Sequence, residues 1–115
     1  MTLSQKQQEF AQCLAEFITW IYTQGWSVRI GEVYRPPFTA REYARTGRGI
    51  INSVHTKKCA VDLFLSLDGV SVTWRNEDYA PLANKWESLH PLARAGHRFR
   101  NRDSVHFSFE HNGVK

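Results

Sequence analysis

Cysteine is scarce in this sequence. Only Cys13 and Cys59 occur, and they form no Cys-x-x-Cys pair, which argues against a zinc knuckle or a redox motif. We therefore expect both to be small apolar residues of the core. The chain also lacks an apolar run long enough to span a bilayer. Its first ten residues are mostly polar, without the apolar segment of a secretory signal, so we expect synthesis in the cytoplasm without a signal peptide.

Strong charge of one sign is also missing, because the formal net charge is only +4. A local basic cluster does occur late in the chain, and it could bind nucleic acid or another polyanion, including the anionic polymers of a bacterial envelope. A solvated basic face is an equally good interpretation. No RNA- or DNA-binding motif occurs, so we expect no specific nucleic-acid partner. The cluster comprises Arg94, Arg98, Arg100 and Arg102.

The composition is that of a folded protein. The 115 residues are 42% hydrophobic and 13% aromatic, which predicts one domain over residues 1–115. The segment Ser4-Gln-Lys-Gln7 has the form of a capping box, and apolar residues then recur at helical spacing until Gly25. Alternating apolar residues from Trp26 onward predict a strand that ends near Tyr34, before two prolines.

The second half of the chain alternates helix and strand signals. A capping-box form at Thr39-Ala-Arg-Glu42 predicts a short helix over 40–45. Cys59–Leu67 reads as a strand, and Asp68-Gly69 predicts a two-residue turn to a partner strand over 70–74. The elements expected after these are a helix over 78–89 and a strand over 104–110. Together they predict an α+β domain with a mainly antiparallel sheet and flanking helices.

One charged residue stands out in the strand signal. Asp62 lies in the apolar run Cys59–Leu65, where an unpaired charge is costly. His55 precedes it by seven residues, and His106 lies on the polar face of the last strand. If the two strands share a sheet, two imidazoles and one carboxylate meet, which suits a catalytic zinc with its fourth position open. Taken singly, each has a simpler interpretation: a loop histidine, an aspartate paired with an arginine such as Arg29, and a histidine on a solvated face.

Two further residues fit hydrolytic chemistry at such a site. Asp103 lies three residues before His106, so a turn there can bring its carboxylate beside the metal, where it can take up a proton and pass it to a leaving amine. Arg35, at the end of an early strand, can offer positive charge to an oxyanion or a substrate carboxylate. Glu110 shares the strand face of His106 and could orient a ligand, although a surface role is the simpler interpretation.

Three segments resemble one enzyme family. Ser53-Val-His-Thr-Lys-Lys-Cys-Ala-Val-Asp62 is similar to the SxHxxGxAxD motif of the zinc D-Ala-D-Ala carboxypeptidase and L-alanyl-D-glutamate endopeptidase family. Asp103-Ser-Val-His106 resembles its second signature, and Val33-Tyr-Arg-Pro36 resembles the strand end whose arginine contacts substrate. The motifs follow the family's order over about residues 26–110. The motif glycine is Lys58 here, so either the loop takes another path or Lys58 adopts unusual backbone torsions.

The resemblance implies a hedgehog/DD-peptidase fold and a role for each motif residue. His55, Asp62 and His106 match the zinc ligands, and Asp103 matches the catalytic acid/base. Arg35 matches the arginine that contacts substrate or oxyanion. The remaining matched residue is Ser53, which lies near the substrate.

The implied function is zinc-dependent hydrolysis of a peptide bond in the peptidoglycan stem, with L-alanyl-D-glutamate endopeptidase activity of the endolysin kind as the first choice. D-Ala-D-Ala carboxypeptidase activity is the alternative within the family. We expect a monomer, made in a bacterial host cytoplasm, that acts at the cell wall or periplasm and dwells on the anionic envelope. Two other hypotheses are a non-catalytic basic module that binds wall polymer or nucleic acid, and a family member that binds zinc without turnover.

Overall fold

The computed structural model describes residues 1–115 and centres on one antiparallel sheet of four strands in the order β1-β2-β4-β3. The strands are β1 (Ser27–Ile30), β2 (Ala60–Ser66), β3 (Ala93–Ala95) and β4 (His106–Phe109). The helices are α1 (Leu3–Thr23), α2 (Pro37–Arg45) and α3 (Ala80–Ser88). Short 3-10 turns cover Val54–Lys57, Asn76–Tyr79 and Gly96–Arg98.

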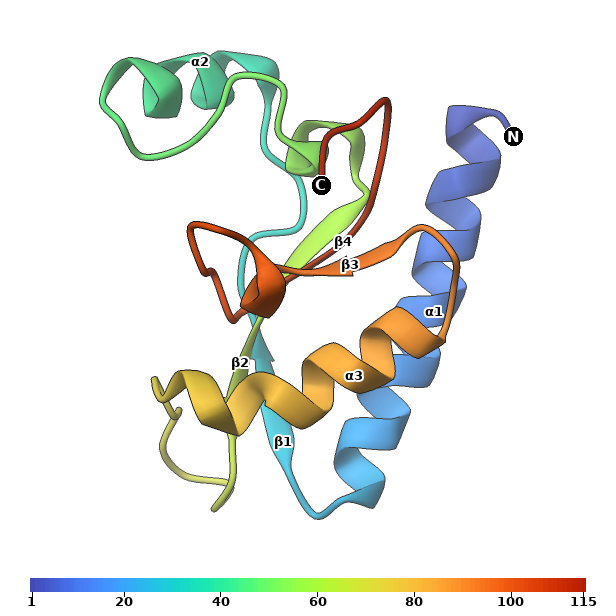
Figure 1. Ribbon diagram of the computed structural model, residues 1–115, viewed down its shortest axis with the longest axis vertical. Coiled ribbons are helices and arrows are strands. Elements are labelled where there is room, and N and C mark those ends of the chain that lie inside the picture. The colour runs from blue at the N-terminus through green and yellow to red at the C-terminus, as the bar shows by residue number, and fades with distance from the viewer.

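The core lies where α1 and α3 pack against each other and against the sheet (Figure 1). Phe17 of α1 is fully buried, with its ring centroid 4.9 Å from that of Phe107 and 5.1 Å from that of Trp86. Each buried aromatic side chain of this size contributes on the order of 2 kcal/mol by leaving water. Because side chains alternate across a strand, Phe107 faces this core while its neighbour His106 faces the opposite side of the sheet.

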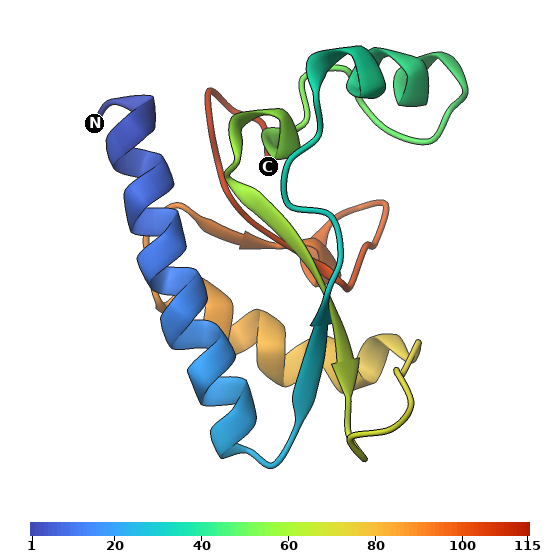
Figure 2. The same cartoon turned by 180° about the vertical axis from the view of Figure 1, so that it is seen from behind.

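Helix α2 stands apart from this body, as both views show (Figures 1 and 2). Only Ala40 of α2 is buried. The helix begins at Pro37 rather than at residue 40, with no side-chain cap, so the capping box expected at Thr39 is not formed. Proline suits the first helical position because its fixed φ is helical and its missing N–H would have no partner there.

Helix α1 also begins earlier than expected. Thr2 is its N-cap: the Thr2 hydroxyl accepts the Gln5 N–H at 3.1 Å, and the Gln5 side chain accepts the Thr2 N–H at 2.7 Å. The Ser/Thr-x-x-Gln pattern therefore occurs in two overlapping copies, Thr2–Gln5 and Ser4–Gln7. The structure uses the earlier copy, which makes the helix longer than expected. The helix ends at Thr23, and Gly25 follows with φ +84°, a conformation that favours glycine.

The hairpin expected after β2 is only a turn. Asp68 Oδ1 accepts the N–H groups of Val70 and Ser71, both at 2.8 Å, and this side-chain capping replaces the two-residue turn. The chain then makes a single isolated bridge, from Ser66 to Val72. Trp74, at the end of this segment, stays 71% exposed, with its ring centroid 5.5 Å from that of Phe64.

Pairing at the two sheet edges also differs from the expectation. β3 was not predicted, because three residues are too few for a periodic pattern. β1 ends at Ile30 rather than near Tyr34. The chain nevertheless stays beside β2, since the Gly31 N–H donates to the Asp62 carbonyl at 2.7 Å and the Asp62 N–H donates to the Glu32 carbonyl at 2.9 Å.

Both cysteines are buried and free, as expected. No helix combines the length and the apolar character that crossing a membrane requires.

Candidate metal centre

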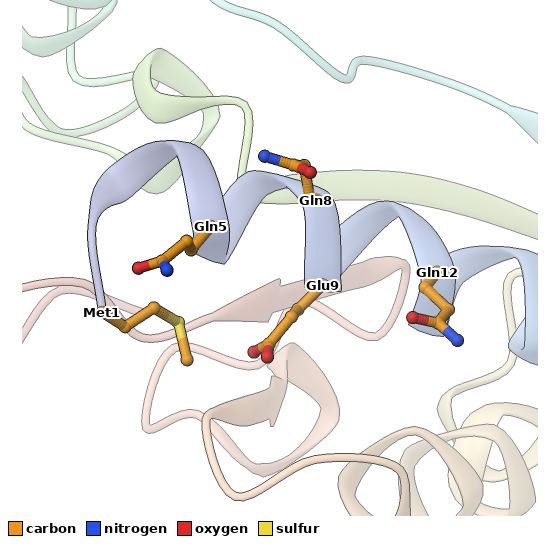
Figure 3. Close-up of a pocket in the computed structure, with 5 residues that line it drawn as sticks. All are labelled: Met1, Gln5, Gln8, Glu9 and Gln12. Carbon is orange, nitrogen blue, oxygen red and sulfur yellow. The ribbon is translucent and has the colours of Figure 1, made fainter.

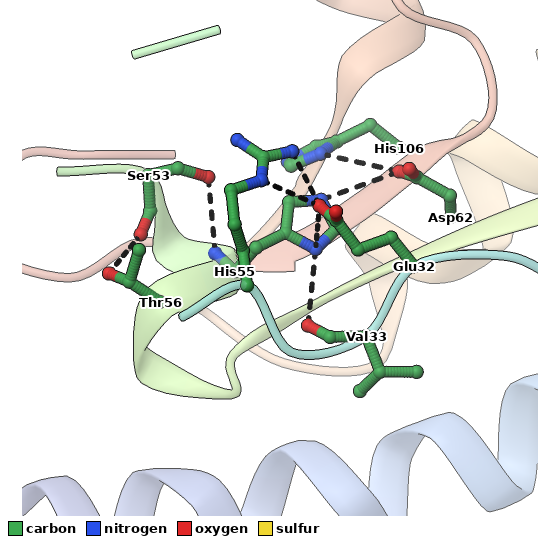
Figure 4. Close-up of polar contacts among 8 residues, drawn as sticks. Glu32, Val33, Ser53, His55, Thr56, Asp62 and His106 are labelled. Carbon is green, nitrogen blue, oxygen red and sulfur yellow. Dashed lines mark hydrogen bonds and ion pairs between the residues drawn. The ribbon is translucent and has the colours of Figure 1, made fainter. Parts of the chain in front are cut away.

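The sheet register brings the three expected ligands together. Asp62 on β2 lies directly opposite His106 on β4, and His55 lies in the 3-10 turn that leads into β2. One ligand atom from each residue can be chosen so that all three lie within 4.8 Å of one another. Figure 4 shows both imidazoles directed at the Asp62 carboxylate.

The distances are close to those of a metal site. Asp62 Oδ1 lies 3.4 Å from His55 Nε2 and 3.9 Å from His106 Nδ1. Two ligands at tetrahedral positions around zinc are separated by about 3.3 Å. Asp62 Oδ1 and His106 Nε2 are buried without a hydrogen-bond partner, which is costly for polar atoms. A cation beside Asp62 Oδ1 would satisfy that oxygen, so the donor set fits a metal ion and the three residues form a group able to hold one.

The other side of the His55 ring is fixed by the segment that follows β1. His55 Nδ1 lies 3.2 Å from the Val33 carbonyl oxygen and 3.6 Å from Glu32 Oε1. An N–H at Nδ1 that donates to this carbonyl leaves the Nε2 lone pair facing Asp62, which is the tautomer a metal needs. The backbone N–H of Arg35 donates to the His55 carbonyl at 3.1 Å, so the same segment also holds Arg35 at the site.

His106 is held in its neutral form. Burial of its ring, reinforced by His55 and partly opposed by Asp62, lowers its pKa to about 4. Neutral imidazole is the form that can ligate a metal. The Phe99 ring, with its centroid 5.3 Å from that of His106, covers one side of the imidazole.

The loop before β2 is shaped by two local features. The Ser53 hydroxyl accepts the His55 N–H at 3.2 Å and caps the 3-10 turn. Lys58 ends the turn in the left-handed conformation, with φ 55° and ψ 36°, which confirms that a lysine in place of the motif glycine takes unusual torsions. A non-glycine residue there costs about 1–2 kcal/mol, yet the turn still places His55 beside Asp62.

All six residues expected from the sequence line one cleft of about 300 Å³. Asp103 lines the cleft and keeps part of its surface in contact with solvent. Partial desolvation of its carboxyl, reinforced by the Asp62 charge, raises the pKa of that carboxyl, and His55 and Arg35 partly offset the increase. Ser53 lines the cleft while capping the His55 turn, so its contact with substrate stays a prediction. The six are Arg35, Ser53, His55, Asp62, Asp103 and His106.

The cleft also contains residues that sequence reasoning missed. Arg48, Gly49 and Asn101 lie in loops, where no periodicity marks a buried or site-facing position. Gly49 is needed for space: a Cβ there would lie 3.1 Å from a terminal nitrogen of Arg35.

The simpler interpretations of single residues do not describe this arrangement. Arg29 lies over the Phe64 ring, 5.9 Å from its centroid, and forms no ion pair with Asp62. Glu110 pairs with Arg94 at 3.5 Å and does not line the cleft.

The late basic cluster is partly neutralised. Arg94 pairs with Glu110, and Arg98 Nε lies 2.5 Å from Glu87 Oε1. Only Arg100 and Arg102 remain without an ion pair. A strongly basic binding face is therefore not formed by these four residues alone.

A second hollow lies along α1 and contrasts with the cleft. Its lining is mostly glutamine side chains spread along one helix face (Figure 3). Its one carboxylate, Glu9, already accepts from His90 at 2.9 Å. The side chains do not converge on a point, so this hollow offers no comparable chemistry.

Gly96 packs closely against two residues of the site, Asp103 and His106. Its carbonyl accepts the Asp103 N–H at 2.9 Å, and a Cβ on Gly96 would clash with the Asp103 carbonyl oxygen and lie 2.9 Å from the His106 Cβ. We expect Gly96→Ala to lower the free energy of unfolding by about 1–3 kcal/mol, as overpacking does, and to reduce metal affinity because Asp103 and His106 must shift. Denaturant unfolding and metal titration measure the two effects.

The matched control for this prediction is Gly25→Ala, at the far end of α1. No atom lies within 4 Å of a Cβ there, but φ is +84°, so only the backbone is strained. Gly25→Ala should destabilise the fold by about 1 kcal/mol with unchanged metal affinity. Equal metal affinity in both variants would contradict the role assigned to Gly96.

The fold and the cluster define a single-domain α+β protein with a candidate metal centre in an open cleft. No protein-family model matches the sequence, and a search of curated proteins finds no match. Among solved structures, the crystal structure of the L-Ala D-Glu endopeptidase ChiX from Serratia marcescens is similar, with a TM-score of 0.63 and 24% sequence identity. The match covers 73% of this chain and 67% of that chain. At this identity the likeness establishes the fold, and it confirms the expected α+β fold class.

Proposed function

We propose that this chain is a zinc-dependent peptidase that cleaves the bond between L-alanine and D-glutamate in the peptidoglycan stem. The main support is the buried group of His55, Asp62 and His106, which opens into a cleft that also contains Asp103 and Arg35. The fold shared with an L-Ala D-Glu endopeptidase supports the choice of bond. The donor set of two imidazoles and one carboxylate supports zinc.

The proposed mechanism assigns one task to each residue. His55, Asp62 and His106 hold the zinc, which when bound polarises the scissile carbonyl and makes water more acidic. Asp103 accepts a proton from the attacking water as the water oxygen bonds to the carbonyl carbon. The same carboxyl then donates that proton to the amide nitrogen as the C–N bond breaks, so the amine leaves neutral.

Arg35 is assigned to the negative charge that develops on the substrate oxygen. Its side chain is only 12% exposed and is held by Glu32, with Arg35 Nε 2.8 Å from Glu32 Oε1. A cation fixed in this way is oriented before substrate arrives, which is the property that makes electrostatic stabilisation effective.

Metal analysis combined with digestion of purified peptidoglycan tests this function. We expect about one zinc ion per chain, release of fragments that begin at D-glutamate, loss of activity on chelation, and recovery when zinc is returned. Mass analysis identifies the bond. Full activity without metal would refute the zinc mechanism, and loss of only a terminal D-alanine would indicate a carboxypeptidase. A zinc-loaded protein that cleaves nothing would be a binding protein.

A further inference from the structure

Charged side chains of both signs line the cleft, and its two guanidinium groups differ in whether they have an ionic partner. Asp62 belongs to the candidate metal centre, and Arg35 is neutralised by Glu32. Arg48 lines the same cleft, but no carboxylate of the protein lies within ion-pair distance of it. On the adjoining helix α2, by contrast, Arg45 pairs with Glu42 at 2.8 Å. The cleft therefore presents one uncompensated guanidinium on its α2 side.

This guanidinium is held in place although it has no ionic partner. Arg48 Nε donates to the Thr46 hydroxyl at 2.9 Å, and the Arg48 backbone N–H donates to the Tyr43 carbonyl at 2.7 Å. The guanidinium carbon lies 4.7 Å from the centroid of the Tyr43 ring, within the range of a cation–π contact. The two terminal nitrogens make no hydrogen bond. A guanidinium oriented in this way is suited to receive a carboxylate through both terminal nitrogens.

Arg35 and Arg48 both contact the ring of Tyr43. The Arg35 guanidinium carbon lies 4.9 Å from the same Tyr43 ring centroid, and Gly49 passes close to Arg35. Arg48 is thus tied to the segment that carries the proposed oxyanion residue. A ligand group bound by Arg48 would lie next to the reacting bond and not at a remote surface.

We propose that Arg48 binds a free carboxylate on the substrate residue that follows the scissile bond. This inference rests on the proposed function and specifies its substrate. D-Glutamate carries two carboxyl groups, and only one of them continues a peptide chain. The residue after an L-Ala–D-Glu bond therefore always has a second carboxyl, which is either a carboxylate or a neutral amide. Arg48 selects the carboxylate form.

The test uses two soluble peptides that contain the L-Ala–D-Glu bond and differ only in whether that second carboxyl is free or amidated. For wild-type protein loaded with zinc, we expect kcat/KM to be about 10- to 100-fold higher for the free carboxylate, the range for one hydrogen-bonded charge pair. In Arg48→Gln this ratio should fall toward one. Arg48→Lys should retain part of the ratio, because lysine keeps the charge without the planar fork.

Arg45→Gln is the matched control. It removes an arginine that is exposed like Arg48 and lies three residues before it, but Arg45 is paired with Glu42 and does not line the cleft. Its ratio should equal that of wild type. Because each ratio compares two peptides on one preparation, a change in the folded fraction cancels.

The outcomes separate this inference from the function on which it rests. Cleavage of neither peptide by the wild-type protein would refute the proposed function. Cleavage of both with no preference, or a preference that survives in Arg48→Gln, would refute the role of Arg48 and leave the proposed function standing.

Discussion

Asp103→Asn should lower kcat by about 10²- to 10⁴-fold, the usual contribution of a general acid–base group, while the fold and the bound metal are retained. Asparagine keeps the size of the side chain and can still form hydrogen bonds, but it cannot take up the proton of the attacking water. Asp62 and Asp103 are the carboxylates that line the cleft. Since Asp62 is assigned to the metal, no second aspartate or glutamate of the cleft is free to replace Asp103.

Metal stoichiometry and peptide hydrolysis should be measured on the same Asp103→Asn preparation. Glu110→Gln is the control, because Glu110 lies close in sequence but pairs with Arg94 outside the cleft. It should have near-normal turnover. Loss of zinc from Asp103→Asn would make Asp103 a ligand, whereas near-normal turnover would remove it from the mechanism.

Asp62→Ala should abolish both zinc binding and hydrolysis. Binding to the folded state alone stabilises a protein by about 2.7 kcal/mol at 100 times Kd, which corresponds to an increase in Tm on the order of 10 °C for a domain of this size. Zinc should therefore raise the Tm of wild-type protein and leave that of Asp62→Ala unchanged. The metal-free variant should be about as stable as metal-free wild type, since Asp62 Oδ1 has no hydrogen-bond partner to lose.

Calorimetry with and without zinc measures these effects independently of activity. Glu77→Ala is the control, because it removes an exposed carboxylate that pairs only with Arg75. It should keep the zinc-dependent increase in Tm. The same increase in Asp62→Ala would show that the ion binds elsewhere.

The sequence was most informative where residues act through a period or a fixed spacing. The helical spacing of Phe10, Phe17 and Ile21 located α1, and the alternation around His106 assigned that residue to the face opposite the core. The spacing of His55 and Asp62 predicted neighbours because one lies in the turn that leads directly into the strand of the other. These signals are local, and local geometry carries over into the fold.

The sequence was least informative where a contact depends on distant chain segments. The three-residue strand β3 exists because its neighbour β4 offers an edge, and nothing within Ala93–Ala95 indicates this. The expected hairpin does not form, because hydrogen bonds from two backbone N–H groups to the Asp68 side chain take the place of the two-residue turn. Arg48 reaches the cleft only because of where the loop after α2 lies in the fold, so no pattern around residue 48 predicts its role.

The direct pairing of Asp62 with His106 has a consequence for how the chain assembles. These strands lie far apart along the chain, so their pairing requires closure of a long loop, which is slow and entropically costly. A slip of one residue would turn His106 to the other side of the sheet and separate it from Asp62. An ion held by both strands would therefore favour the correct alignment over every shifted one. Metal present during folding would therefore raise the fraction of chains in which β2 and β4 pair in the native register.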